Sequence, residues 1–366
     1  MKFPAINKKF LKSPEFSFWT FLIFTAIFRL LTFRNNYQDG QIIKITSRVL
    51  EEPVRYSFKQ KIDLSGFYFY LPLYPEVGYG DVISVKGQVK KKELIKPELI
   101  SVSSGNNLLF GFRKRLIDFY RETLPEPHAS LVAGITLGSK SEIPEKFWQD
   151  LKKTGVIHVV VASGMNVTFV AGFLISFLTV FLSRKKALVL AVLGIWLYVA
   201  LSGFEAPLIR AAVMATLAFW AQGVGRLSFS WRVLFLTVLI MLIFNPSWTG
   251  DIGFILSFVA TTSLMLFQTK INNYLKIVPN FLKEGFSTSI AAQIGVAPIL
   301  FVSFGQFNIL SPVINALVLW TIPGIMILGG VGGILGLIFP FLGKLILYLS
   351  CPLTWWFTKI ISIFNF

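Results

Sequence analysis

Residues 187–203 read ALVLAVLGIWLYVALSG, an apolar run without a single charged residue. A run of this length is typical of a helix that crosses a membrane. Of the 366 residues in the chain, 54% are hydrophobic and only 14% are charged, whereas about a quarter of the residues of a soluble domain are charged. A soluble core cannot bury this much apolar surface, so we predict a membrane protein with many spans.

Similar apolar stretches fill the C-terminal half of the chain. From Val156 onward the acidic residues are Glu205, Asp251 and Glu284, as expected where an ionised side chain is costly. The predicted fold is therefore a polytopic α-helical membrane protein with about 8–10 transmembrane helices, some of them broken. The spans predicted in this half are 156–182, 187–203, 207–224, 230–246, 251–268, 284–304, 307–322, 323–339 and 342–364.

Proline and charge refine this topology. Pro298, Pro312 and Pro323 are expected to break spans into halves. Residues 1–35 combine a basic head with an apolar run and predict a membrane anchor with its N-terminus in the cytoplasm. The predicted inner connections carry lysine and arginine, whereas the outer ones carry acids alone, so the positive-inside rule places residues 36–105 outside the cytoplasm. The net charge of +17 is explained either by this rule or by a polyanionic partner.

Residues 36–105 differ in character from the rest of the chain. Short β-rich runs at Gln41–Val49, Val54–Ile62, Phe67–Leu71 and Val82–Lys90 are separated by turn residues. Their number and size predict a small extracytoplasmic β-barrel domain of OB type, with five strands. Residues 106–126 predict an amphipathic helix that lies on the membrane surface or packs against the β domain; both alternatives stay open. Residues 127–366 form the predicted transmembrane domain.

Four stretches of the apolar half carry polar and helix-breaking residues. They are 154–166, 203–214, 245–258 and 291–308. Irregular backbone at membrane depth is tolerated only where it is buried in protein or lines a water-filled cavity. These stretches therefore mark the candidate functional site.

The stretches resemble the ComEC competence family, the inner-membrane DNA-uptake proteins of bacteria. The family patterns Thr-Gly-x2-His-x4-Ser-Gly and Gly-Phe-x5-Arg-Ala-x2-Met are matched at Thr154–Gly164 and Gly203–Met214. The pattern Asn-Pro … Asp-x-Gly-Phe-x-Leu-Ser-Phe is matched at Asn245–Phe258, and Pro-x5-Phe-Gly-x-Phe at Pro298–Phe307. All four occur in family order, the match covers about residues 107–340, and the β region resembles the family's extracytoplasmic OB domain.

The resemblance implies a channel in the bacterial cytoplasmic membrane that translocates single-stranded DNA during natural transformation. A polyanion needs a pore lined by small and amide-bearing residues and a few cations, and the N-termini of broken helices attract phosphate. The candidates for the DNA path are Thr154, Gly155, His158, Ser163, Gly164, Asn166, Glu205, Arg210, Asp251, Gln293, Gln306, Asn308 and, as a further polar pore-lining residue, Asn315.

Several of these residues have a structural alternative. Ser163 and Asn166 could hold neighbouring helices together by hydrogen bonds. An unpaired charge is expensive at the depth of Arg210, so pairing with Glu205 or Asp251 competes with contact to phosphate. Asp251 is also predicted to cap the helix that follows it. For His158 a packing role is favoured over pH sensing, and the glycine pairs 329/333 and 332/336 are predicted packing devices.

In the β region, Tyr68, Phe69 and Tyr70 are candidates for base stacking, although about half of such alternating aromatics must fill the core. Lysines at the end of the region are candidates for phosphate contact: Lys86, Lys90, Lys91 and Lys92. A basic groove beside stacking aromatics is the usual solution for binding single strands.

The chain also departs from the family pattern. Family members commonly carry a histidine two residues after the Ser-Gly pair; here Asn166 stands nearby, so a hydrogen-bonding role is expected but not a titrating one. With no His-x-His-x-Asp-His cluster and a chain that ends at Phe366, the nuclease of longer relatives and an ATP-driven motor are expected from partner proteins, together with a DNA receptor. The lipid bilayer is the other partner, a homo-oligomer stays an alternative, and no cofactor or metal is expected.

Two other functions compete with the channel. One is an intramembrane hydrolase or transferase that uses Ser163 with His158, although a spacing of five residues places them about 140° apart on a helix and no nucleophile elbow surrounds the serine. The other is a membrane assembly protein that keeps the fold without transport.

Overall fold

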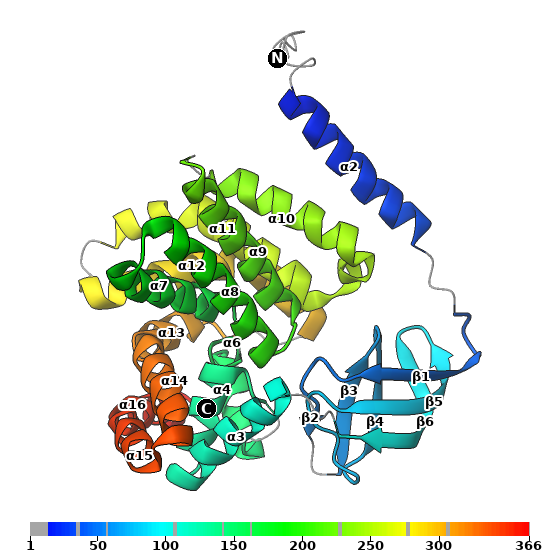
Figure 1. The fold of residues 1–366 in the computed structure, drawn as a ribbon, viewed down its shortest axis with the longest axis horizontal. Coiled ribbons are helices and arrows are strands. Elements are labelled where there is room, and N and C mark those ends of the chain that lie inside the picture. Colours follow the sequence, from blue (N-terminus) through cyan, green and yellow to red (C-terminus); the bar gives the residue numbers. More distant parts are fainter. Residues whose placement is uncertain are drawn as a thin grey trace.

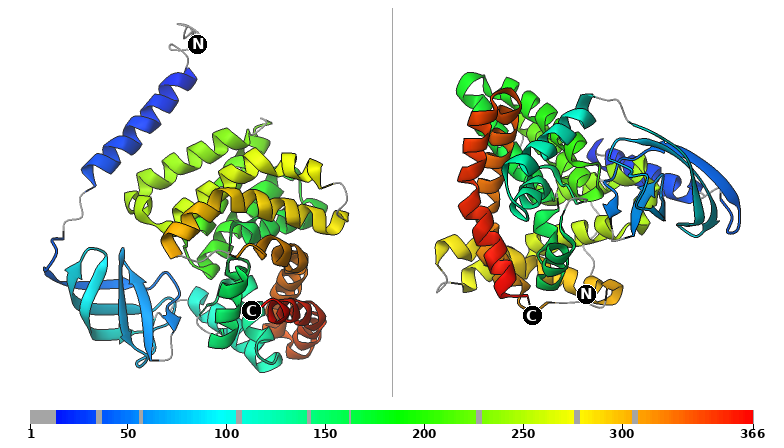
Figure 2. Two further views of the ribbon diagram at one scale, coloured as in Figure 1. Left: turned by 180° about the vertical axis from the view of Figure 1, so that it is seen from behind. Right: turned by 90° about the horizontal axis from the view of Figure 1, so that it is seen from below.

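The computed structural model describes residues 14–33, 37–55, 58–104, 108–140, 143–161, 163–225, 229–275, 279–304 and 308–365. The described elements form three parts: helix α2 (Pro14–Thr32), a β domain made of strands β1–β6, and a helical domain that runs from α3 (Leu108–Thr123) to α16 (Cys351–Ile363) (Figure 1). The β domain lies beside the helical domain, and the C-terminal helices lie on the side away from it in both figures (Figure 2).

The β domain is a six-stranded mixed sheet. Its strands follow the order β1-β5-β6-β4-β3-β2, and the described pairs are antiparallel except for β4 with β6. The alternating sequence gives it one buried face, because successive side chains of a strand point to opposite sides. The strands are β1 (Ile42–Arg48), β2 (Val54–Arg55), β3 (Lys59–Leu64), β4 (Phe67–Pro72), β5 (Val82–Lys90) and β6 (Glu93–Ser103).

The structure differs from the predicted five-stranded barrel of OB type in two respects, closure and the number of strands. The two end strands, β1 and β2, do not pair with each other among the described residues, so the sheet is open. β2 has only two residues and follows Pro53, which has no N–H to donate. Strand β6, eleven residues long, was missed because Pro97 interrupts its apolar pattern; register shifts in β5 opposite this region accommodate the proline.

The helical domain contains the apolar helices that composition predicts. Its elements after α3 are α4 (His128–Leu137), α5 (Glu145–Thr154), α6 (Ile157–Val160), α7 (Gly164–Phe181), α8 (Arg184–Ser202), α9 (Ala206–Gly223), α10 (Ser230–Phe244), η1 (Pro246–Gly250), α11 (Ile252–Tyr274), α12 (Asn280–Phe304), α13 (Ser311–Leu319), α14 (Ile322–Ile338), α15 (Pro340–Leu349) and α16.

Fewer of these helices can cross a membrane than the sequence predicts. Within the described residues, four apolar stretches are long enough: Ile157–Phe181, Arg184–Ser202, Ile252–Tyr274 and Lys283–Ser303. The number rises to six if the bent pairs α13–α14 (45°) and α15–α16 (42°) are each one span. The chain is thus a membrane protein with several apolar helices. Nine spans were predicted after residue 156, and the number is lower because helices such as α10 are too short to count as spans.

The prolines break helices in two of the three predicted places. Pro312 and Pro323 stand at the first turns of α13 and α14, where a missing N–H costs nothing. Pro298 instead lies inside the continuous helix α12. The N-terminal helix is confirmed as a helix: α2 packs on α10, with the rings of Trp19 and Phe235 5.6 Å apart.

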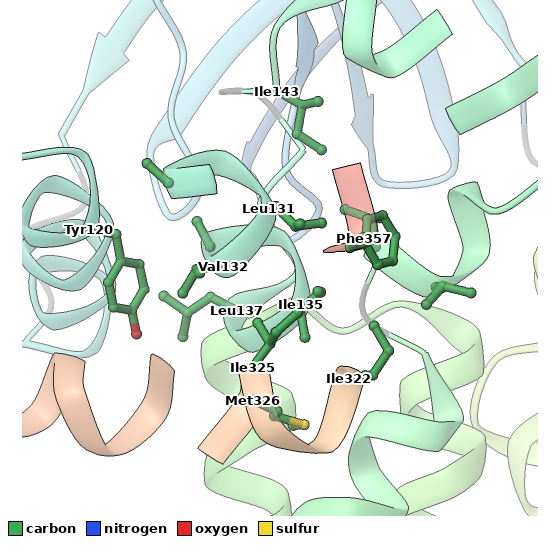
Figure 3. Packing of buried hydrophobic residues seen from close by; sticks show 14 of the residues in the cluster. Tyr120, Leu131, Val132, Ile135, Leu137, Ile143, Ile322, Ile325, Met326 and Phe357 are labelled. Atoms are coloured by element: carbon green, nitrogen blue, oxygen red, sulfur yellow. The ribbon is translucent and has the colours of Figure 1, made fainter. Parts of the chain in front are cut away.

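Helix α4 lies at the centre of the helical domain. From Ala129 to Leu137 every residue is buried, and its side chains Val132 and Ile135 lie near Tyr120 of α3 and Met326 of α14 (Figure 3). A helix that is apolar all round is expected to be buried in this way. α4 therefore packs between α3 and α14 in the core of the helical domain.

Helix α3 is amphipathic as predicted, but its apolar face meets the helical domain. Phe119 and Tyr120 are buried, and the Tyr120 hydroxyl donates to the carbonyl of Gly329 at 2.9 Å. The predicted packing role of the glycine pairs is confirmed: a Cβ at Gly333 would meet the Tyr120 hydroxyl, and one at Gly336 would overlap the ring of Phe119. Small residues on α14 let α3 approach it closely.

Candidate functional site: the Arg210 cluster

Three of the four polar stretches meet at Arg210, on the second turn of α9. Its Nη1 donates to the carbonyl oxygen of Ser257 on α11 at 2.7 Å. Its Nη2 lies 2.7 Å from the point where a Cβ would stand at Gly164, the first residue of α7. The ring of Phe258 lies 5.8 Å from its guanidinium carbon. We call Arg210, Gly164, Ser257 and Phe258 the Arg210 cluster.

Of the two alternatives for Arg210, pairing with Glu205 or Asp251 does not occur among the described residues. Glu205 forms an ion pair with Lys140 instead. Asp251 accepts a hydrogen bond from the backbone N–H of Phe254 at 2.6 Å, so it caps α11 as predicted. Arg210 makes no ion pair with a described residue, and its buried Nε has no hydrogen-bond partner among them. The guanidinium of Arg210 is thus bound by the carbonyl of Ser257 and lies against Gly164, and no carboxylate of a described residue belongs to the cluster.

The stretch 154–166 is a broken helix around this cluster. Gly155 ends α5 at a φ of 74°, which favours glycine. Asn166 is fully buried and donates to the carbonyl of Ile135 on α4 at 3.0 Å, which is the interhelical role that the sequence left open. The Ser163 hydroxyl lies 3.4 Å from Asn166 Oδ1. His158 is exposed on the short helix α6, and no described hydrogen bond joins it to Ser163.

The fourth stretch is joined to the first. Gln293 donates to the carbonyl of Asn308 at 3.2 Å, and Asn308 donates to the carbonyl of Lys153 at 2.7 Å. Asn315 is buried and bonds to Ser311. The amides therefore tie α12 and α13 to the end of α5. Gln306, a further candidate, lies outside the described residues.

A hollow of about 390 Å³ opens between α12 and α13. Gln293 is the polar residue of its lining, and apolar side chains such as Phe286, Ile290 and Pro312 make up the rest. The hollow has no described cation, so it does not join the Arg210 cluster as a polyanion site.

The outer face of the β3–β4 hairpin pairs lysines with tyrosines. Tyr68 and Tyr70 are half-buried, whereas Phe69 between them is fully buried in the core, so the predicted split of the aromatics is correct. Lys61 lies over the ring of Tyr68 at 5.1 Å, and Lys59 over Tyr70 at 4.4 Å. Lys59 and Lys61 were missed as candidates. Two lysines spaced by two residues before the Ser-Gly turn, and two tyrosines with the same spacing after it, are the signal that could have found them.

The predicted lysine cluster is spread along β5 and the turn after it. Lys86 and Lys90 lie opposite Glu98 and Glu93 of β6, so acids partly offset their charge. The ammonium of Lys92 lies 3.3 Å from the carbonyl of Gly250 in the helical domain. The last candidate, Lys91, is in the turn, and its backbone N–H donates to Asp39. The ammonium groups over the tyrosine rings are thus those of Lys59 and Lys61, whereas Lys92 contacts Tyr68 through its backbone carbonyl.

No group of three or more His, Cys, Asp or Glu side chains within the described residues is arranged to hold a metal ion. At the Arg210 cluster, the guanidinium presents N–H donors to an anion, and phosphate and carboxylate fit its planar fork.

The chain is similar to several curated proteins. The ComE operon protein 3 of Bacillus subtilis (strain 168) is 30% identical over 233 residues, which are 62% of this chain and 29% of that protein. Competence protein ComA of Neisseria gonorrhoeae is 31% identical over 145 residues (37% of this chain, 21% of that protein). An uncharacterised protein of Aquifex aeolicus (strain VF5) is 32% identical over 211 residues (56% and 44%).

The chain spans less than half the length of these curated relatives. No solved structure matches it. The model of the family described as Competence protein matches residues 135–366, which contain all three helices of the Arg210 cluster. The match extends over more than half of the chain, and the chain therefore belongs to the Competence protein family.

Proposed function

We propose that this protein takes part in DNA uptake as a channel that moves single-stranded DNA across the cytoplasmic membrane. The observation that carries the proposal is Arg210: a cation inside the helical domain that makes no ion pair with a described residue. The family and the printed names of its relatives support a role in competence. The channel itself is our inference from the site.

The charge at Arg210 suits a passing polyanion. Arg210 is half-buried, and its guanidinium is fixed on one side by the carbonyl of Ser257, which leaves N–H donors for a phosphate. A site in a conducting path must bind its ion weakly enough for the ion to leave. A single cation would attract a phosphate of the strand and still release it. The polar candidates Asn166, Gln293 and Asn308 would then keep the broken helices together around the path.

The outer face of β3–β4 would receive the strand. Tyr68 and Tyr70 each lie on the surface of the hairpin with a lysine ammonium over one face of the ring. Aromatic rings stack on bases of any sequence, and lysines neutralise phosphates. This proposal replaces the cluster of Lys86, Lys90, Lys91 and Lys92 as the main basic partner of the tyrosines.

The proposed topology follows the charge pattern. The N-terminus would be cytoplasmic and the β domain extracytoplasmic, so a strand would meet β3–β4 before it meets Arg210. The proposed partners are the strand, the bilayer, and separate DNA-receptor, nuclease and motor proteins, with a homo-oligomer as a further arrangement.

Uptake of labelled DNA into the cytoplasm tests the proposal. In a deletion strain, the wild-type gene should restore uptake, Arg210→Met should not, and Arg210→Lys should restore part of it because it keeps the charge but loses the planar fork. Arg232→Met is the matched control, since Arg232 is exposed and stacks on Phe229. Normal uptake in the deletion strain, or in Arg210→Met, contradicts the proposal.

A further inference from the structure

The β domain packs against the start of α3 through aromatic rings. Phe110 of α3 lies edge-on to Tyr79, with ring centroids 5.0 Å apart, and the guanidinium carbon of Arg48 lies 5.3 Å from the centre of the Phe110 ring. A Cβ at Gly80 would stand only 2.4 Å from this ring. The loop before β5 therefore fits closely against α3.

A buried ion pair lies beside this aromatic contact. Arg113 of α3 lies 3.2 Å from Glu52 in the loop between β1 and β2, and the two side chains are only 5% and 8% exposed. The guanidinium of Arg113 also lies over the ring of Tyr79 at 4.8 Å. Removal of one partner of such a pair is costly, because the other charge stays buried without compensation. Glu52 is thus a fixed point of contact between the two domains.

Glu52 also binds the loop that follows α4 and, through it, the start of α9. Its carboxylate accepts from the Ser139 hydroxyl at 2.9 Å and from the backbone N–H of Lys140 at 2.7 Å. The ammonium of Lys140 pairs with Glu205, the residue before α9. Burial lowers the pKa of Lys140, but the charge of Glu205 and its hydrogen bond raise it more, so the net shift is upward and Lys140 stays charged.

Two hydrogen bonds from the β domain reach the neighbouring helix ends. The Tyr79 hydroxyl donates to the carbonyl of Ala200, near the end of α8, at 2.9 Å. The ammonium of Lys92 donates to the carbonyl of Gly250 at 3.3 Å, directly before Asp251, the cap of α11. The β domain therefore contacts the segment before α11 as well as the segment before α9.

These two helices carry the two sides of the Arg210 cluster. Because α9 begins at Ala206 and α11 at Ile252, Arg210 and Ser257 lie about 6 Å and about 7.5 Å along their helices from these starts, at about 1.5 Å per residue. The hydrogen bond between them, 2.7 Å long, is thus close to the helix ends that the β domain contacts. A shift of either end would change the distance between Arg210 and Ser257.

We propose that the β domain is a brace, a rigid support that holds the starts of α9 and α11 and so positions Arg210, with Glu52 and Lys92 as its positioning residues. Glu52 acts on α9 through Lys140 and Glu205, and Lys92 acts on the start of α11. Neither residue contacts DNA in this role. The consequence for DNA uptake rests on the proposed function, whereas the support of the two helices does not.

Hydrogen–deuterium exchange of the full chain in lipid nanodiscs, measured by mass spectrometry, tests the brace without DNA. Glu52→Gln keeps the shape of the side chain but places an amide NH2 group against donors that the carboxylate accepts from. Loss of a hydrogen bond to a charged group changes an opening equilibrium about tenfold or more, so segment 208–214 of α9 should exchange at least about tenfold faster. Glu76→Gln is the matched control, because it breaks an exposed ion pair with Arg55 in the same domain.

Lys92→Met gives a second test at a residue whose exposure makes misfolding of the variant no explanation. It removes the hydrogen bond to Gly250 and should speed exchange in segment 254–260 of α11 about two- to tenfold, with segment 208–214 unchanged. Lys92→Arg keeps a cationic donor and should exchange like the wild type. Lys44→Met is the matched control, since Lys44 is exposed on β1 and its ammonium makes no hydrogen bond or ion pair with the described helical domain.

Residues 340–363 are the internal reference, because α15 and α16 lie away from the β domain (Figure 1). Their exchange should stay at the wild-type rate in each of these variants. The brace is overturned if Lys92→Met exchanges like Lys44→Met in segment 254–260, or if Glu52→Gln exchanges like Glu76→Gln in segment 208–214. It is also overturned if both variants accelerate 340–363 as much as their own segments.

DNA uptake in the same variants connects the brace with Arg210. Glu52→Gln should lower uptake about tenfold or more, whereas Glu76→Gln should not. Accelerated exchange with normal uptake in Glu52→Gln overturns the positioning role. Normal uptake in Arg210→Met contradicts the proposed function instead, and the exchange rates then still decide whether the β domain supports α9 and α11.

Discussion

The guanidinium of Arg210 occupies the space that any side chain at Gly164 would need, since a Cβ there would stand 2.7 Å from Nη2. Two polar stretches more than forty residues apart in the chain are therefore complementary in shape. Because Gly164 has no side chain, Arg210 of α9 can lie across the start of α7 and reach the carbonyl of Ser257.

Gly164→Ala tests this relationship. The added methyl meets the flexible end of Arg210, so Arg210 should move away from Ser257. Loss of a hydrogen bond from a charged group is worth about 1.5–3 kcal/mol, so DNA uptake is expected to fall about tenfold or more. Gly172→Ala on the same helix meets nothing within 4 Å and is the control. Equal uptake by both variants would show that the position of Arg210 does not matter.

Gly343→Ala should destabilise the C-terminal helices. A Cβ at Gly343 on α15 would overlap the backbone of Gly336 on α14, which has no flexible end to yield. Overpacking of this kind costs about 1–3 kcal/mol or more, which thermal unfolding in detergent would detect as a lower midpoint. Gly330→Ala on α14 has open space and should be neutral or stabilising by up to about 1 kcal/mol. A similar midpoint for both variants contradicts the close packing of α14 and α15.

Tyr68→Ala and Tyr70→Ala should each weaken binding of single-stranded DNA by the full chain. Base stacking on an aromatic ring is worth about 1–3 kcal/mol, so the Kd is expected to rise about 5- to 150-fold. Fluorescence anisotropy with a labelled oligonucleotide measures this, and affinity should fall with salt because lysines contact phosphates. Tyr74→Ala is the control, because Tyr74 is exposed in the loop after β4; a loss as large as that of Tyr68→Ala would place the DNA elsewhere.

Asp251 separates a capping role from a role in the DNA path. Asp251→Ala removes the acceptor for the Phe254 N–H and should cost about 0.5–2 kcal/mol of stability. Asp251→Asn keeps a good cap without the charge, so it should restore both the unfolding midpoint and DNA uptake. If Asp251→Asn is stable but transports poorly, the charge itself is needed and the capping interpretation is incomplete.

Much of the architecture could be predicted from local sequence. A long apolar run predicts a membrane helix without knowledge of its neighbours. In the bilayer the backbone N–H and C=O groups must bond to each other, and a helix satisfies them within one segment. The alternation around Phe69 determines which aromatics are buried, and Asp251 determines a cap through contacts only three residues away. These features depend on the period of a helix or strand, which the sequence contains.

Only the tertiary structure decided which residues meet. The contacts of Arg210 with Ser257, Glu205 with Lys140, Lys92 with Gly250, and Glu52 with Arg113 join residues that no helix or strand period relates. The open edge of the sheet and the bent helix pairs also depend on what packs beside them. A charged or polar side chain in an apolar interior takes whichever partner the packed helices bring within hydrogen-bond distance, and that choice is made by the whole fold rather than by neighbours in the chain.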